Sequence, residues 1–244
     1  METSIDRHWL KSYPEGVAHD VDPGQYLSLG QLLEESFRRY ARQPFSVCMD
    51  EWMTYGELDR WSAALGAWLQ AQGLAPGARV GTMLPNVPQF PVTMAAVLRA
   101  GYTCVNVNPL YTARELEHQL RDSGAEAIVI LENFAHTLEE ALERTAVKQV
   151  VIASMGDLLG LGYGRWITFA VRHLAKMVPP YRLPLSDGRK VVPFSKAVAP
   201  NSPPPLPPVA QTLDSVAFLQ YTGGTTGLSK GAVLTHRNIV AAIL

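Results

Sequence analysis

Helix and strand signals alternate along residues 28–153, and this alternation is the feature that most limits the fold. Short apolar, β-branched runs at residues 79–84, 103–107, 127–131 and 149–153 are separated by segments with helical periodicity. Strands that alternate with helices of about 10–15 residues are typical of βαβ units, whose strands are parallel and buried on both faces. We therefore predict an α/β fold with a mostly parallel sheet and flanking helices.

Two of the expected helices begin with a specific capping pattern. Thr54 with Glu57, and Thr112 with Glu115, have the spacing of a capping box, in which side chains and main chain bond reciprocally. Gly124 follows the second of these helices and is a typical stop signal. Further helices are expected from Ser28 to about Pro44, at residues 93–99 and at residues 137–144, with another strand at residues 45–49.

The composition restricts the class of protein. The chain has 244 residues, 21 basic against 22 acidic, and 47% apolar residues, so it is globular and has no general electrostatic reason to bind nucleic acid. The longest apolar zone is interrupted by prolines and Arg99, and the first 13 residues lack an apolar core. We therefore expect neither a membrane span nor a signal peptide. Cys48 and Cys104 lie among apolar residues, and we expect buried, reduced thiols in a cytoplasmic protein.

Residues 158–213 differ in character from the rest of the chain, with seven basic residues and one acidic residue. Residues 165–178 have helical periodicity, with an apolar arc opposite a basic arc of Arg165, Arg172 and Lys176. Such a helix either packs in the core or rests reversibly on an anionic membrane surface. Residues 200–208 contain six prolines and are expected to form an extended surface linker.

The chemistry is expected in the loop at residues 221–231, which reads YTGGTTGLSKG. Glycines let backbone N–H groups approach an anion closely, threonines add hydroxyl donors and a lysine adds positive charge. Together these groups can hold a triphosphate. The expected phosphate-site residues are Tyr221, Thr222, Gly223, Gly224, Thr225, Thr226, Gly227, Ser229, Lys230 and Gly231.

Other interpretations of this loop are weaker. A Walker A loop needs the lysine directly after a glycine and at the start of a helix, whereas Lys230 leads into a strand-like run. Gly227 to Gly231 also match G-x-S-x-G, the nucleophile elbow of serine hydrolases, with Ser229 as nucleophile. That elbow needs a helix directly after it and an acid downstream, and no acid follows Asp214. A flexible Gly/Thr turn is the remaining alternative.

The stretch YTGGTTGLSKGAVLTHRN at residues 221–238 resembles the phosphate-loop signature of the acyl-adenylate-forming superfamily. Upstream, MTYGELDRWSAALGAWL, LPNVPQFPVTMAAVLRAG, VNVNPLYTARELEHQLRDSGAEAIVI and NFAHTLE are similar in order and spacing to bacterial long-chain fatty-acid–CoA ligases. The resemblance covers nearly the whole chain. Ser229 is a departure, because many members have proline at this position.

The resemblance implies a ligase that joins a fatty acid to CoA in two steps, through an acyl-AMP intermediate and with ATP and Mg²⁺. It implies that Thr222 helps to hold the metal, that Lys230 and the loop act on phosphate, and that His236 lines the acyl–adenylate pocket. A helix-capping role is the alternative for His236. The expected location is cytoplasmic. Because the implied substrate, a long-chain fatty acid, partitions into bilayers, reversible contact with the inner face of the membrane through residues 165–178 is the alternative to core packing of that helix.

The resemblance also implies that residues 1–244 are an incomplete N-terminal adenylating domain. We divide it into an α/β unit at residues 1–157, a basic and Pro-rich insert at 158–213, and a strand with the phosphate loop at 214–244. The chain alone is expected to be inactive, because the implied C-terminal catalytic domain is not part of it. A non-catalytic nucleotide-binding module is the alternative function.

Overall fold

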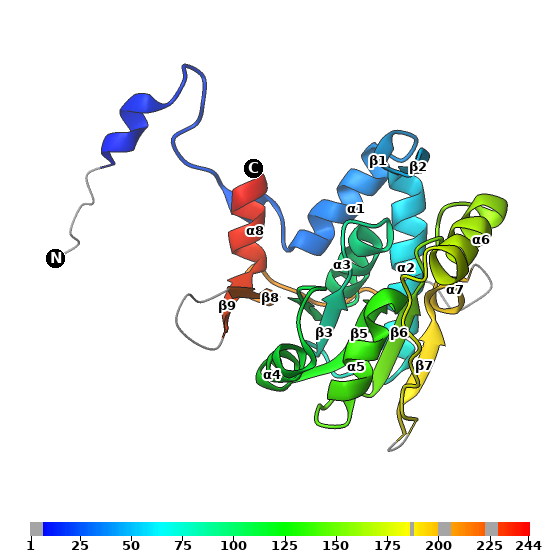
Figure 1. The fold of residues 1–244 in the computed structure, drawn as a ribbon. Coiled ribbons are helices and arrows are strands. Elements are labelled where there is room, and N and C mark those ends of the chain that lie inside the picture. The colour runs from blue at the N-terminus through cyan, green and yellow to red at the C-terminus, as the bar shows by residue number, and fades with distance from the viewer. Residues whose placement is uncertain (1–6, 186–187, 200–205, 223–228) are drawn as a thin grey trace.

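The computed structural model describes residues 7–185, 188–199, 206–222 and 229–244. Figure 1 shows a central sheet with helices on both faces. The strands are β1 (Pro44–Cys48), β2 (Glu51–Thr54), β3 (Arg79–Met83), β4 (Thr103–Asn106), β5 (Ala125–Leu131), β6 (Gln149–Ala153), β7 (Lys190–Pro193), β8 (Val216–Thr222) and β9 (Lys230–Thr235). The α-helices are α1 (Leu29–Arg39), α2 (Tyr55–Ala71), α3 (Gln89–Arg99), α4 (Ala113–Ser123), α5 (Ala135–Leu142), α6 (Leu161–Phe169), α7 (Phe194–Ala197) and α8 (His236–Ile243). Short helical turns are η1 (His8–Ser12), η2 (Pro23–Gln25), η3 (Glu132–Phe134) and the π-helical η4 (Ala170–Leu174).

The main sheet has the order β7-β6-β5-β3-β4-β8-β9. All neighbouring strands are parallel except β8 and β9, which form an antiparallel hairpin at one edge. The predicted α/β class and mostly parallel sheet are confirmed. Parallel strands have their carboxyl ends on the same side of a sheet, so the carboxyl end of β8 lies on the same side as those of β4, β5 and β6.

The sheet separates two apolar cores, because successive side chains of a strand point to opposite faces. Along β5, Val129 and Leu131 pack in the core with α1, α2 and α3, whereas Ile128 and Ile130 pack in the core with α4 and α5. Burial on both faces explains why these strands read as continuous apolar runs in the sequence.

The predicted helix caps are confirmed. Both capping boxes form, with Thr54 accepting from the Glu57 N–H and Thr112 accepting from the Glu115 N–H. Gly124 ends α4 in the left-handed conformation, with φ of 64°. These signals are readable in the sequence because each depends only on residues within one turn of the helix end.

Two strands were not expected from the sequence. β2 pairs with β1 in a separate two-stranded hairpin. β7 joins the edge of the main sheet beside β6. The segment at 158–213 therefore contributes a strand to the main sheet. Most of the Pro-rich run lies outside the described residues, since only 206–208 of it are described.

The helix expected at residues 165–178 needs a correction. α6 begins earlier, at Leu161, and gives way at Ala170 to the π-helical turn η4, which ends at Leu174. Lys176 then has a φ of +52°, so no helix continues to residue 178. Among the described residues, no helix has the length and apolarity needed to cross a membrane.

Arg172 also differs from its expected place on a solvated basic face. Its guanidinium donates to Oε2 of Glu132, from Nε at 2.9 Å and from Nη2 at 2.5 Å. The Glu132 side chain is 1% exposed and that of Arg172 is 44% exposed, so a partly exposed arginine on η4 reaches a buried acid at the carboxyl end of β5. Arg172 is thus a partner for a buried acid rather than a free surface cation.

The two cysteines are unpaired, but only one occupies the expected environment. Cys104 on β4 is fully buried, and burial raises the pKa of its thiol to about 11. Cys48 on β1 is only partly buried, because the β1–β2 hairpin lies outside the main sheet.

Candidate functional site

The expected phosphate site lies in the β8–β9 hairpin. Tyr221 pairs with Gly231 across the two strands, and Thr222 pairs with Lys230. These four residues belong to strands rather than to the loop in which the sequence placed them. Gly223, Gly224, Thr225, Thr226 and Gly227 lie outside the described residues. The described part of the site is therefore a pair of strand ends that bring Thr222 opposite Lys230 at the sheet edge.

Tyr221 fixes the β8 side of this hairpin. Its ring lies over Gly231, where an added Cβ would come within 3.0 Å of the ring carbons Cε2 and Cζ. Its hydroxyl donates a hydrogen bond of 2.6 Å to Oδ2 of Asp122 on α4. Burial and the neighbouring Asp122 carboxylate raise the pKa of Tyr221 well above its ordinary value, so the hydroxyl stays protonated and donates.

Thr222 and Lys230 are exposed, as groups that bind a soluble anion must be. The Thr222 hydroxyl is a hard oxygen ligand of the kind that Mg²⁺ accepts. Within the described part of the chain, no cluster of three or more His, Cys, Asp or Glu side chains could hold a metal ion.

Ser229 does not occupy a nucleophile elbow. The strand β9 begins at the next residue, whereas the elbow requires a helix there. The imidazole of His118 lies 3.2 Å from the main-chain oxygen of Ser229. This contact can orient the backbone, but it does not join the imidazole to the Ser229 hydroxyl, so the serine-hydrolase interpretation is not supported.

His236 begins α8 and is fully buried. Its Nδ1 accepts a 3.0 Å hydrogen bond from the main-chain N–H of Leu29, the first residue of α1, and its Nε2 lies 3.3 Å from the Gln211 side-chain amide. Burial lowers the pKa of His236, which keeps the imidazole neutral and able to accept. His236 thus contacts the first residue of α1. A role for His236 in an acyl pocket stays a prediction.

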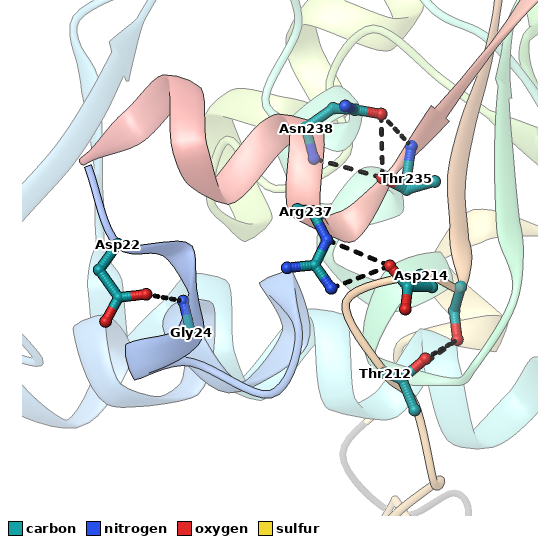
Figure 2. A network of polar contacts seen from close by, with 8 residues as sticks. Asp22, Gly24, Thr212, Asp214, Thr235, Arg237 and Asn238 are labelled. Carbon is teal, nitrogen blue, oxygen red and sulfur yellow. Dashed lines mark hydrogen bonds and ion pairs between the residues drawn. The ribbon is translucent and has the colours of Figure 1, made fainter. Parts of the chain in front are cut away.

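The start of α8 is further held by polar contacts (Figure 2). Thr235 and Asn238 form a third capping box, which the sequence analysis did not identify. Arg237 donates to Asp214 Oδ1 from Nε at 3.1 Å and from Nη2 at 2.9 Å. These contacts tie the end of the hairpin to the segment before β8.

A cavity lies on the side of the sheet where the strands have their carboxyl ends, just beyond β6. Its volume is about 800 Å³, and its walls come from the β1–β2 hairpin, α2 and α6. Asp157 and Arg172 line it together with aromatic side chains that include Trp52, Trp61 and Phe169. Burial raises the pKa of Asp157 to about 6, although a hydrogen bond from the Ser154 N–H lowers it in part. Sequence reasoning did not find this cavity, because its walls are far apart in the chain.

The comparison with protein families decides the assignment. The profile described as AMP-binding enzyme matches residues 33–244. The chain belongs to this AMP-binding enzyme family. The match includes the β8–β9 hairpin and residues 33–157 of the α/β unit, as expected from the motif at residues 221–238.

Among relatives of this AMP-binding chain are long-chain-fatty-acid–CoA ligases. That of Escherichia coli O157:H7 is 47% identical over 234 residues, which are 96% of this chain and 41% of the ligase. That of Haemophilus influenzae is 40% identical over 248 residues, covering 98% of this chain and 42% of the ligase. The chain therefore spans about two fifths of the length of these curated relatives.

Solved structures share the fold of this AMP-binding chain. The anthranilate CoA ligase AuaEII, crystallised with anthranoyl-AMP, superposes with a TM-score of 0.69 at 19% identity, over 89% of this chain and 37% of that one. A long-chain-fatty-acid–CoA ligase from Archaeoglobus fulgidus superposes with a TM-score of 0.64 at 24% identity, over 88% and 38%. At these identities the likeness is evidence for the fold alone, and it agrees with the predicted adenylate-forming ligase fold.

Proposed function

We propose that the protein containing this chain activates long-chain fatty acids as CoA thioesters, through an acyl-AMP intermediate made from ATP. The observation that carries the proposal is the 47% identity to a long-chain-fatty-acid–CoA ligase over 96% of the chain. The exposed Thr222 and Lys230, side by side at a sheet edge, support it. The non-catalytic module is the weaker alternative, because the relatives across the whole chain are named as ligases.

The chemistry that this function requires explains the residue types at the hairpin. A carboxylate is a poor acyl donor, and transfer of AMP to it makes a good leaving group. The reaction is helped when the β- and γ-phosphates are held so that pyrophosphate departs in line with the attack. Lys230 supplies a positive charge for those phosphates. Thr222 supplies an oxygen toward Mg²⁺, which would neutralise phosphate charge when bound.

Lys230→Ala tests the phosphate assignment. We expect weaker ATP use and slower adenylation for fatty acids of every chain length, measured as ATP–pyrophosphate exchange in the full-length protein. Loss of one charged contact to a transferring phosphate typically costs about 2–4 kcal/mol. A defect that varied with acyl chain length would instead put Lys230 beside the acyl group. Absence of exchange with all fatty acids in the folded, unchanged protein would contradict the ligase proposal.

The 244-residue chain by itself is expected to form no acyl-CoA, because it spans about two fifths of its relatives. The same chain should still bind pyrophosphate at the hairpin. Acyl-CoA formation by the purified chain would mean that the reacting groups are placed differently from this proposal.

We also propose a cytoplasmic enzyme that rests on the inner face of the membrane through α6 and η4. Apolar side chains are exposed along this segment and just beyond it, at Leu161, Trp166, Phe169, Leu174 and Met177. Arg165 and Lys176 are exposed beside them, whereas Arg172 is engaged with Glu132. Exposed apolar and basic groups on one segment favour an anionic bilayer, where each cation contributes about 1 kcal/mol.

Sedimentation with anionic liposomes tests this membrane contact. Arg165→Glu combined with Lys176→Glu should reduce binding, and binding of the unchanged protein should fall with salt. The control is Arg38→Glu with Arg42→Glu, which makes the same change of charge at exposed positions on and after α1. Equal loss in both double variants would mean that net charge, not this segment, controls binding. Undiminished binding in the first double variant would contradict the proposal.

A further inference from the structure

Helix α4 contacts both sides of the β8–β9 hairpin through two side chains one turn apart. His118 and Asp122 stand at positions i and i+4, on the same face of the helix. Asp122 accepts the hydrogen bond of the Tyr221 hydroxyl at 2.6 Å, and His118 Nε2 donates to the main-chain oxygen of Ser229 at 3.2 Å. One contact precedes residues 223–228 and the other follows them.

The helix that makes these contacts is itself held firmly. Gln119 donates from Nε2 to the main-chain oxygen of Asn106 at 2.7 Å, which ties α4 to the carboxyl end of β4. Leu116 and Leu120 are fully buried in the core on that face of the sheet. Because β4 also pairs with β8, α4 is anchored beside the hairpin that it contacts.

The charge of Asp122 indicates that this residue favours anion binding by holding its partner in place, not by attracting the anion. A carboxylate near a phosphate site repels the anion, so the charge by itself opposes binding. The contact it makes is a hydrogen bond that holds the ring of Tyr221 over Gly231, on the strand that also carries Lys230. A group that fixes a strand end can favour binding even when its charge does not.

We propose that His118 and Asp122 are positioning residues for the phosphate site, holding the two strand ends so that Thr222 and Lys230 face a diphosphate group together. The inference rests on the proposed function, because it assumes that the hairpin binds the diphosphate part of ATP or free pyrophosphate. It assigns two residues outside the loop motif, on a helix about 100 residues upstream, to the affinity of the site.

The expected effects follow from the strength of each contact. If the held arrangement is the binding-competent one, loss of a contact lowers its population, and the apparent affinity falls by the same factor. One ordinary hydrogen bond corresponds to a factor of about five, and one to a charged group to about tenfold or more. We therefore expect pyrophosphate affinity to fall by up to about fivefold in His118→Ala and by up to about tenfold in Asp122→Ala.

Conservative variants separate position from charge. Asp122→Asn keeps an oxygen that accepts from Tyr221 and removes the negative charge, so its affinity should equal or exceed that of the unchanged protein. His118→Gln keeps an N–H donor and should recover part of the loss. The control is Glu117→Ala on the same helix, whose ion pairs are with Arg121 and Arg144 and which should bind normally.

The experiment is calorimetric titration of the 244-residue chain and each variant with pyrophosphate in Mg²⁺, and separately with Mg·ATP. Thermal unfolding of each protein is measured alongside. The inference predicts weaker binding in His118→Ala and Asp122→Ala, and normal binding in Glu117→Ala. It predicts normal or tighter binding in Asp122→Asn, and non-additive losses when Asp122→Ala is combined with Tyr221→Phe. A loss that is smaller with Mg·ATP than with pyrophosphate would still support the positioning role.

Two results would overturn the inference, and they are distinguishable from failure of the proposed function. Normal binding in His118→Ala and Asp122→Ala would remove the positioning role while leaving the phosphate site. Losses in Glu117→Ala as large as those in the other two variants would reduce the effect to helix stability. No saturable binding by the unchanged protein would instead remove the phosphate site itself, and this inference with it.

Discussion

Arg172→Ala should strongly destabilise the protein, because it leaves the Glu132 carboxylate buried without its partner. Glu132 is 1% exposed and accepts both described hydrogen bonds from the Arg172 guanidinium. Removal of one member of a buried ion pair typically costs about 3–5 kcal/mol. The Arg172 side chain is 44% exposed, so water screens part of the interaction and we expect the lower end, about 3 kcal/mol. For a domain of this size that equals a loss of roughly 6–12 °C in Tm.

Urea unfolding followed by tryptophan fluorescence measures the effect. The matched control is Arg165→Ala, seven residues earlier on an exposed position of α6, which should change stability by about 0.5 kcal/mol or less. Adding Glu132→Gln to Arg172→Ala removes the stranded charge and should restore part of the loss. Equal stability of the two arginine variants would refute the stabilising role of the Arg172–Glu132 ion pair.

Three further changes test other parts of the fold. Burial raises the pKa of Asp157 to about 6, so the stability that its protonation contributes is present below pH 4 and is lost as pH rises through 6. In urea unfolding, Asp157→Asn should therefore be more stable than the unchanged protein at pH 8, by up to roughly 3 kcal/mol, and equal to it near pH 4. Because burial lowers the pKa of His236, the unchanged protein should lose stability as pH falls below about 6.5. This part of the pH dependence should vanish in His236→Ala, which should also lose about 2 kcal/mol of stability at neutral pH. Gly101→Ala should lower Tm more than Gly73→Ala, since both have a positive φ but only at Gly101 would a Cβ lie 2.5 Å from Val209 Cγ1; equal losses would contradict the close approach.

The parts of the fold that sequence predicted well are those determined within one helical turn or one strand. The capping boxes at Thr54 and Thr112 and the stop at Gly124 depend on neighbours in the chain, so their residue types carry the signal. The buried parallel strands were equally readable, since both faces are covered and the runs are continuously apolar. β7 was missed because it is four residues long at a sheet edge, within a basic segment.

The motif of the proposed phosphate site can be read in the sequence, whereas the side chains that contact its strands cannot. The glycines, threonines and Lys230 predict a phosphate loop by composition alone. Nothing local marks His118 or Asp122, whose partners lie 111 and 99 residues away. The same reason explains the error at Arg172, where helical periodicity indicated a solvated face but tertiary packing brought a buried acid 40 residues upstream within hydrogen-bond distance.

The order of strands in the sheet has a consequence for synthesis on the ribosome. β4 pairs on one side with β3, which precedes it closely, and on the other side with β8, through Cys104 and Phe218. At about 5–20 residues per second, the ribosome needs roughly 5–25 s to make the intervening chain. Throughout that interval the nascent protein has a buried-type strand with one open, apolar edge. Such edges pair readily with other chains. We therefore expect the period before β8 emerges to be when this protein depends most on chaperones.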